Sequence, residues 1–225
     1  MSKFLTIFNH QLKIFYCHPK NFLSNILFFI CFVIIFLIVL NPLYSSIQSP
    51  IHENNNSNIQ LVVASFLSIV CCLISSTQDF LREDFSDGTL EQMVINCENI
   101  ESFIIAKMLA NWFNNCFVAV TFSALIGIIL NCESNFLWHF FIIFLLTSIL
   151  INNICSLCGS IAILGGSTAL IAFTALPLIL PTILFGCLGV YENFILNFKI
   201  LLALNIFLNP LLFIASGKIV KIALD

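Results

Sequence analysis

The stretch NFLSNILFFICFVIIFLIVL, residues 21–40, contains no charged side chain. A helix needs about 20 mainly apolar residues to cross a bilayer core about 30 Å thick, so this stretch predicts a membrane span. The apolar region of a secretory signal peptide has roughly 7–15 residues and is followed by a small-residue cleavage site. This run is longer and lacks such a site, so we expect a membrane span and not a signal peptide.

The composition of the whole chain has the same character. Of its 225 residues, 60% are hydrophobic and 8% are charged. Soluble domains carry about 25% charged residues, so the composition argues against a soluble enzyme or a nucleic-acid-binding protein. It predicts an all-α integral membrane protein.

The uncharged segments outside residues 21–40 predict five more spans. They are residues 61–77, 108–130 and 136–157, a segment starting near Ser167, and residues 200–220. Residues 134–191 carry no charge and are too long for one crossing, so they supply the fourth and fifth spans. The turn between these spans is expected at Gly159, Gly165, Gly166 and Ser167. We therefore expect one transmembrane domain, residues 1–225, with six helices.

Residues 2–18 precede the first span and have an amphipathic pattern. Apolar residues recur there at helical spacing: Phe4, Leu5, Phe8, Leu12 and Phe15. This pattern predicts a helix that lies in the membrane interface and ends at Pro19. A frayed N-terminus is the alternative.

The fifth span is interrupted by residues that disfavour a regular helix. They are Pro177, Pro181, Gly186 and Gly189. Non-helical backbone at membrane depth is tolerated only where protein or a watery cavity shields it. We expect the span to end near Pro177 and a short re-entrant segment to follow at residues 177–190. A single kinked helix that continues to Val190 is the alternative.

The basic residues predict the orientation of the spans. Seven of the eight fall on the side of the termini: Lys3, Lys13, Lys20, Arg82, Lys107, Lys218 and Lys221. Lys199 falls on the opposite side. Because Lys and Arg accumulate in cytoplasmic loops, we expect both termini in the cytoplasm.

Most of the acidic residues lie between the second and third spans. Of the eleven, seven fall there: Asp79, Glu83, Asp84, Asp87, Glu91, Glu98 and Glu101. Asp87 and Gly88 predict a turn between two short helical segments. We call residues 79–94 the elbow, within a cytoplasmic loop at residues 79–98. Two short acidic helices suit the docking of a soluble partner, and an ordinary solvated loop is the alternative.

Inside the spans the polar residues are mainly asparagines, which are expected to fasten helices together. They are Asn111, Asn114, Asn115, Asn152, Asn153, Asn205 and Asn209. No carboxylate lies in mid-span, which argues against secondary active transport. His52 and His139 are isolated candidates for contact with a ligand such as haem iron. Cys155 and Cys158 have no further ligands nearby, so no metal site is predicted.

The chain has no nucleotide-binding loop of its own. None of its glycines belongs to a GxxxxGK[ST] sequence, and Gly217-Lys218 is followed by Ile219. Any ATP must therefore be hydrolysed by another chain. We predict a membrane subunit with no catalytic residue.

Three blocks of this sequence resemble one family. LREDFSDGTLEQ (residues 81–92), AKMLANW (residues 106–112) and LGGSTALIAFTALPLILPTILFG (residues 164–186) occur in the order and spacing of the CcmB family. That family is the membrane permease subunit of the haem exporter ABC complex of cytochrome c maturation. The chain departs from the family at Ile163 and Leu164, where basic residues are usual.

The resemblance implies an export-type ABC permease fold in a bacterial inner membrane, with the mitochondrial inner membrane as the alternative. The implied partners are a second copy of the chain, two copies of an ABC ATPase subunit that binds the ATP, and haem-handling membrane proteins. Haem is the implied cargo. The elbow would be the coupling helix that receives force from the ATPase. Its implied ATPase contacts are Arg82, Glu83, Asp84, Asp87, Gly88, Thr89, Leu90, Glu91 and Gln92.

Two other functions stay open on the sequence alone. The chain could serve another export-type ABC system for lipids, drugs or glycans, or act as a membrane scaffold that transports nothing. Charge reversal at Glu83 and Asp84 should release an ATPase subunit from either kind of permease and should have no such effect on a scaffold.

Overall fold

The computed structural model describes residues 6–9, 12–13, 19–47, 53–77, 80–96, 100–165, 168–191 and 193–224. Every regular element within these ranges is a helix. Six helical stretches among them are long and apolar enough to cross a membrane. The predicted all-α integral membrane class is therefore confirmed.

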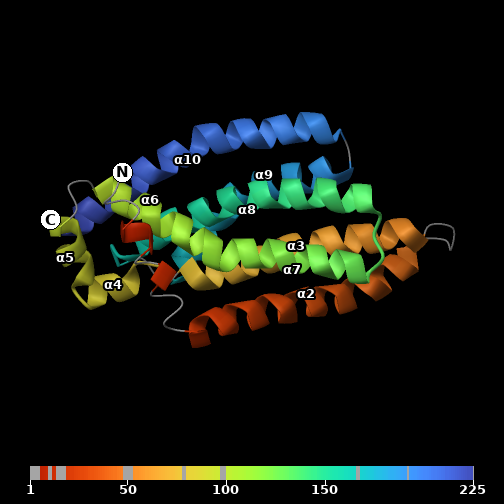
Figure 1. The fold of residues 1–225 in the computed structure, drawn as a ribbon, viewed down its shortest axis with the longest axis horizontal. Coiled ribbons are helices and arrows are strands. Elements are labelled where there is room, and N and C mark those ends of the chain that lie inside the picture. The colour runs from red at the N-terminus through yellow and green to blue at the C-terminus, as the bar shows by residue number, and fades with distance from the viewer. Residues whose placement is uncertain are drawn as a thin grey trace.

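The long helices run side by side along the longest axis of the molecule (Figure 1). The first span is α2 (Pro19–Ile47) and the second is α3 (Glu53–Thr77). The third is built from α6 (Ile100–Asn111), the π-helix η1 (Trp112–Phe117) and α7 (Val118–Ile129). The last three are α8 (Ser134–Ala162), α9 (Thr168–Tyr191) and α10 (Phe194–Leu224). Each predicted span corresponds to one of these.

The fifth span differs from the re-entrant segment expected at residues 177–190. α9 continues through Pro177 and Pro181 to Tyr191, so the alternative of a single helix is the one found. The two glycines serve close packing and do not break the helix. A Cβ atom on Gly186 would lie 2.9 Å from the Phe66 ring of α3, and one on Gly189 would lie 3.0 Å from Ile143 of α8.

Gly159 also differs from its predicted place in a turn. It lies inside α8, where a Cβ atom would approach the carbonyl oxygen of Thr77 to 2.7 Å. Gly165 does lie in the turn after α8, with a positive φ of 92° that favours glycine. Gly166 and Ser167 are outside the described residues.

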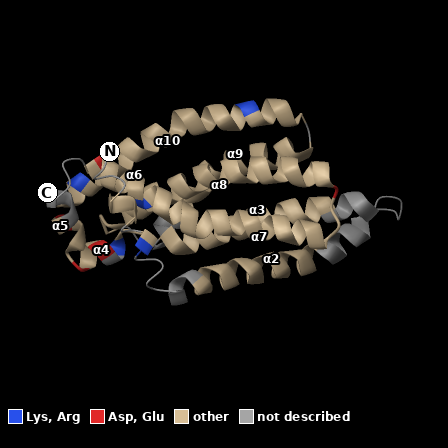
Figure 2. Cartoon of the chain, in the orientation of Figure 1, with Lys and Arg blue, Asp and Glu red and all other residues tan. Residues whose placement is uncertain are grey.

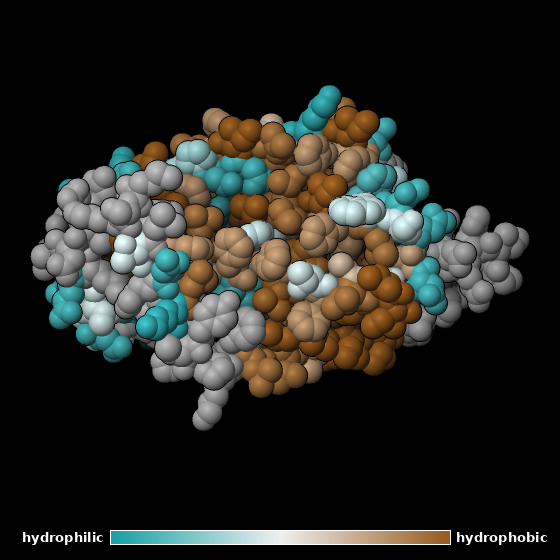
Figure 3. Space-filling view, viewed as in Figure 1, coloured by the Kyte–Doolittle hydropathy of each residue, from teal (hydrophilic) through white to brown (hydrophobic). Residues whose placement is uncertain are grey.

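The helices enclose two apolar cores. The larger core lies among the spans and includes Phe66 of α3 and Phe140, Phe144 and Ile151 of α8. α8 is buried along most of its length, whereas α2 and α10 expose many large apolar side chains. Figure 3 shows brown, hydrophobic side chains across the middle of the visible face and teal, hydrophilic ones mainly toward the ends. This distribution is that of a bundle surrounded by lipid.

Charged residues gather at one end of the bundle, around α4 (Arg82–Ser86) and α5 (Thr89–Asn96) (Figure 2). Described residues near both ends of the chain pack there as well. Ile7 and Leu224 lie against the second core, which includes Leu81, Leu90 and Phe103. An even number of crossings accounts for this shared end.

Only part of the expected interfacial helix is described. Residues 6–9 and 12–13 are helical. The Phe8 ring lies 6.0 Å from the Phe113 ring of η1, centroid to centroid. The rest of residues 2–18 lies outside the described residues, as do His52, Asp79 and Glu98.

Candidate functional site

The elbow consists of two short helices, as predicted. α4 ends where the Gly88 amide donates to the carbonyl of Phe85, at 3.3 Å. Gly88 has a positive φ of 69°, a conformation that costs glycine little and other residues more. The Thr89 hydroxyl donates to the carbonyl of Asp84 at 3.2 Å and so ties the start of α5 to α4. These local bonds hold the two helices at a fixed turn.

The inner face of the elbow is apolar and belongs to the second core. Leu81 and Leu90 are fully buried against Phe103 and Met108 of α6 and Val220 of α10. Leu90 was expected to contact an ATPase, and its burial corrects that expectation. A leucine with no exposed surface in the subunit anchors the elbow to the spans and is not available to a partner.

Beneath the elbow lies a partly buried ion pair between Lys107 of α6 and Asp84 of α4. Only 8% of Lys107 is exposed, and its Nζ atom also lies 5.5 Å from the centre of the Phe80 ring. A charge that is largely removed from water needs a partner of opposite charge. The pair therefore fastens the elbow to the start of the third span.

Sequence reasoning used Lys107 only as a marker of topology and missed this contact. The available signal was its position in AKMLANW, where a lone cation follows an apolar run. A lysine is rarely buried unless it is paired.

The outer face of the elbow is polar around one exposed aromatic ring. Phe85 is 40% exposed and was not among the predicted contacts. Other residues of the predicted contact set are exposed around it: Arg82, Asp87, Glu91 and Gln92. The Glu83 side chain lies outside the described part of the chain. The structure thus divides the predicted set into an outward surface and the inward residues Asp84 and Leu90.

A row of hydrogen-bonded asparagines crosses the bundle from α2 to α10. In each bond the amide nitrogen donates to the side-chain oxygen of the next residue. The bonds run from Asn25 to Asn115 (3.0 Å), Asn115 to Asn111 (2.8 Å), Asn111 to Asn152 (2.9 Å), Asn152 to Asn153 (3.3 Å), Asn153 to Asn209 (2.9 Å) and Asn209 to Asn205 (3.2 Å). We call these seven residues the asparagine relay.

The asparagine relay connects α2, the third span, α8 and α10. At its last member, Asn205 donates to the carbonyls of Leu146 in α8 and Leu201 in α10. The expectation that asparagines fasten the helices is confirmed for these residues. Asn25 was missed, because it lies near the end of an apolar span that needed no polar contact to be recognised.

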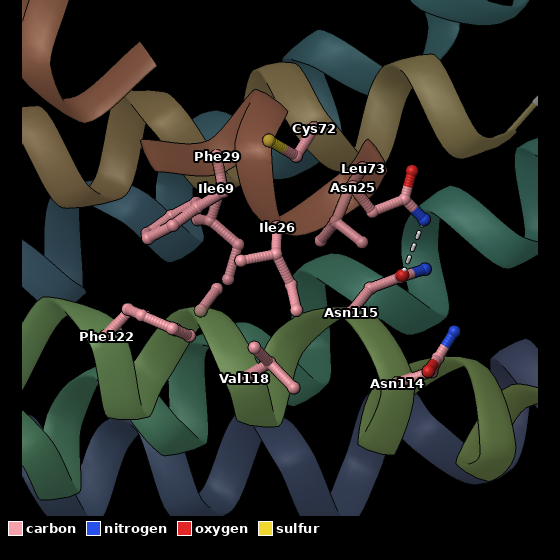
Figure 4. Close-up of a pocket in the computed structure, with 11 residues that line it drawn as sticks. Asn25, Ile26, Phe29, Ile69, Cys72, Leu73, Asn114, Asn115, Val118 and Phe122 are labelled. Carbon is pink, nitrogen blue, oxygen red and sulfur yellow. Dashed lines mark hydrogen bonds between the residues drawn. The ribbon is translucent and has the colours of Figure 1, made fainter. Parts of the chain in front are cut away.

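The π-helix η1 contributes Asn115 to the relay and borders a small cavity. The cavity is about 20 Å³, which suffices for one water molecule. The amides of Asn25 and Asn115 meet on one side of it, and Phe29 and Phe122 lie on the other (Figure 4). The Nδ2 atom of Asn114 is buried beside it without a hydrogen-bond partner.

His139 lies at the opposite end of the bundle from the elbow. Its ring stacks on the Phe194 ring with centroids 4.1 Å apart. The two residues line an open hollow of about 490 Å³ together with Asn193 and Lys199. Among the residues that the structure describes, no group of three or more His, Cys, Asp or Glu side chains is placed to hold a metal ion.

Comparison with known proteins assigns a family to this architecture. The family model described as "CcmB protein" matches residues 2–223. Heme exporter protein B of Haemophilus influenzae is 24% identical over 191 residues, which cover 81% of this chain and 79% of that protein. Heme exporter protein B of Pseudomonas aeruginosa is 22% identical over 188 residues, which cover 81% of this chain and 78% of that protein.

Proposed function

Because the chain belongs to the CcmB protein family, we propose that it is the permease subunit of an ATP-driven haem export system serving cytochrome c maturation. In this role it hydrolyses nothing itself and couples the ATPase activity of a separate subunit to haem delivery or release. The observation that carries the proposal is the family match over residues 2–223, which includes the elbow and all six spans.

The elbow is the proposed docking site of the ATPase subunit. Its outer face presents Phe85 among charged and polar side chains. An aromatic anchor with a polar surround is the usual composition of an interface hot spot. Its inner face is fixed to α6 and α10, so a push on the elbow reaches the spans directly.

This role requires the elbow to face the cytoplasm, where ATP is available. The clustering of basic residues at the elbow end supports that orientation. We propose that the subunit lies in the bacterial inner membrane with both termini cytoplasmic. There it would pair with a second copy of itself, with two ATPase subunits and with haem-handling membrane proteins.

Haem is the proposed cargo of the complex. The cavity beside η1 holds about one water molecule, which is far less than a haem occupies. We therefore propose that haem moves along a surface shared with a partner chain and not through the cavity beside η1.

Deletion of the gene tests the haem assignment. We expect covalent haem on c-type cytochromes to disappear and to return when the gene is supplied again. Normal holocytochrome levels in the deletion strain would refute the assignment and leave export of lipids, drugs or glycans as the competing function.

A charge-reversed elbow tests the docking assignment. Asp87 and Glu91 are the better targets because both are exposed, whereas reversal of Asp84 would also break the internal pair with Lys107. The double variant Asp87→Lys, Glu91→Lys should lose the ATPase subunit during copurification. Glu133→Lys makes the same charge change at an exposed site of the opposite end and should retain it. Retention by both variants would contradict docking at the elbow and favour a scaffold.

A further inference from the structure

We propose that Lys107 is a positioning residue through which the elbow moves the third span, and that the asparagine relay carries this movement on to α8 and α10. The inference deepens the proposed coupling role and rests on it. It adds a specific route through named side chains, none of which would touch ATP or the ATPase.

The first step is the contact between the elbow and α6. Asp84 and Lys107 are paired where both are shielded, with 26% and 10% of their side chains exposed. Lys107 also faces the Phe80 ring, and Leu90 fills the core beside them. Separating the two side chains would remove an opposite charge from beside a largely buried ammonium group, so the elbow and α6 are expected to move together.

The second step runs along the third span. Lys107, Asn111 and Asn115 are spaced four residues apart, which places them near one another along a helix face. Asn115 donates to Asn111, and Asn111 donates to Asn152 of α8. Asn152 in turn donates to the carbonyl of Met108, the residue after Lys107. The backbone next to the ion pair is thus bonded directly to α8.

The third step crosses the bundle. Asn152 donates to Asn153, Asn153 to Asn209 and Asn209 to Asn205, so the same row of bonds reaches α10. Apolar side chains can slide past one another in lipid, whereas hydrogen-bonded amides fix the relative height of two helices. Helices connected in this way are expected to shift as a group.

The fourth step concerns η1, the segment of the third span whose helical winding differs from the rest. π-helical turns are rare in proteins, and those that occur are often found at functional sites. The Nδ2 atom of Asn114 has no hydrogen-bond partner, and the cavity beside it leaves space next to η1. We infer that η1 changes its winding when the elbow is pushed.

A charge swap in the assembled complex tests the route. Asp84→Lys and Lys107→Asp should each keep the ATPase subunit bound, because the exposed docking residues are unchanged. For Asp84 this replaces the release expected from the sequence, since its side chain pairs with Lys107. Each should lower covalent haem transferred per ATP hydrolysed at least about tenfold, within the usual range of coupling between sites. The double variant should recover most of that loss. A double variant no better than the worse single variant would overturn the proposal.

Two further variants keep the test decisive where a reversed charge prevents membrane insertion. Lys107→Met keeps the alkyl stem, and Asn152→Leu breaks the asparagine relay without touching the ion pair. Both should retain the ATPase subunit and lose transfer per ATP. Unchanged transfer in either variant would contradict the route.

A fluorescence measurement separates failure of this inference from failure of the proposed function. The chain has two tryptophans, so Trp138→Phe leaves only Trp112, which is buried and donates to Ser148 of α8 at 3.1 Å. In the full chain in nanodiscs, with no ATPase present, Asp84→Asn should shift the emission of Trp112. The exposed Asp87→Asn should not.

An unchanged emission in Asp84→Asn, or an equal shift in both variants, would overturn the route even if the haem assignment holds. Conversely, normal levels of covalent haem on c-type cytochromes in the deletion strain would refute the haem assignment. The emission shift in Asp84→Asn would still be expected in that case.

Discussion

Replacement of Phe85 by alanine is expected to weaken binding of the ATPase subunit about thirtyfold. Phe85 is 40% exposed, and a phenylalanine side chain covers about 200 Å², so about 80 Å² is available to a partner. At about 25 cal/mol per Å², burial of that area stabilises the complex by about 2 kcal/mol. Because about 1.4 kcal/mol changes Kd tenfold, the loss corresponds to about thirtyfold.

The affinity of the ATPase subunit for the permease in nanodiscs measures this effect. Phe207→Ala is the matched control, since it removes the same ring from an exposed position on α10. We expect the control to bind the ATPase with an unchanged Kd. A Phe85→Ala variant that also binds like the unmodified protein would show that the ring is not at the interface and would refute the docking surface described here.

Three further outcomes are expected. Leu90→Ala should destabilise the elbow by about 2–5 kcal/mol, because Leu90 is fully buried. Thermal unfolding should detect this loss, and Leu196→Ala, at an exposed position, is the control. Gly159→Ala should lower the unfolding midpoint, because its Cβ would lie 2.7 Å from the carbonyl oxygen of Thr77. Gly217→Ala should be tolerated, because its Cβ would lie 3.2 Å from the movable Cγ of Glu101 and at an ordinary contact distance of 3.8 Å from the Glu101 Cα. For orientation, an impermeant maleimide applied to intact cells should label Ser134→Cys above background and label Lys221→Cys only after permeabilisation. Labelling of Lys221→Cys in intact cells would overturn the cytoplasmic elbow.

Sequence patterns were sufficient wherever hydropathy alone decides the structure. A span must satisfy its backbone hydrogen bonds internally, so a long uncharged segment has few alternatives to a helix. Glycine and proline signals were less reliable inside these segments. In a soluble protein, residues such as Gly186 and Gly189 often indicate a turn, whereas in this bundle they allow α9 to approach α3 and α8 closely.

Half of the candidate site could be predicted in the same way. The two helices of the elbow follow from local turn chemistry at Gly88 and from the concentration of acids in one loop. The division of its residues into an outer and an inner face does not follow from that pattern. In a helix of five residues such as α4, one turn contains nearly all positions, and periodicity cannot separate the faces.

The sequence by itself determined the helical class, the six spans and the place of the acidic elbow, because each depends on the transfer of a short segment between water and lipid. Only the tertiary structure decided that Lys107 pairs with Asp84, that Leu90 faces inward while Phe85 faces outward, and that asparagines from four spans form one row of bonds. These features join residues far apart in the chain. The chemistry of an isolated lysine or asparagine requires a partner without specifying which one, and only the packing of the helices brings that partner within reach.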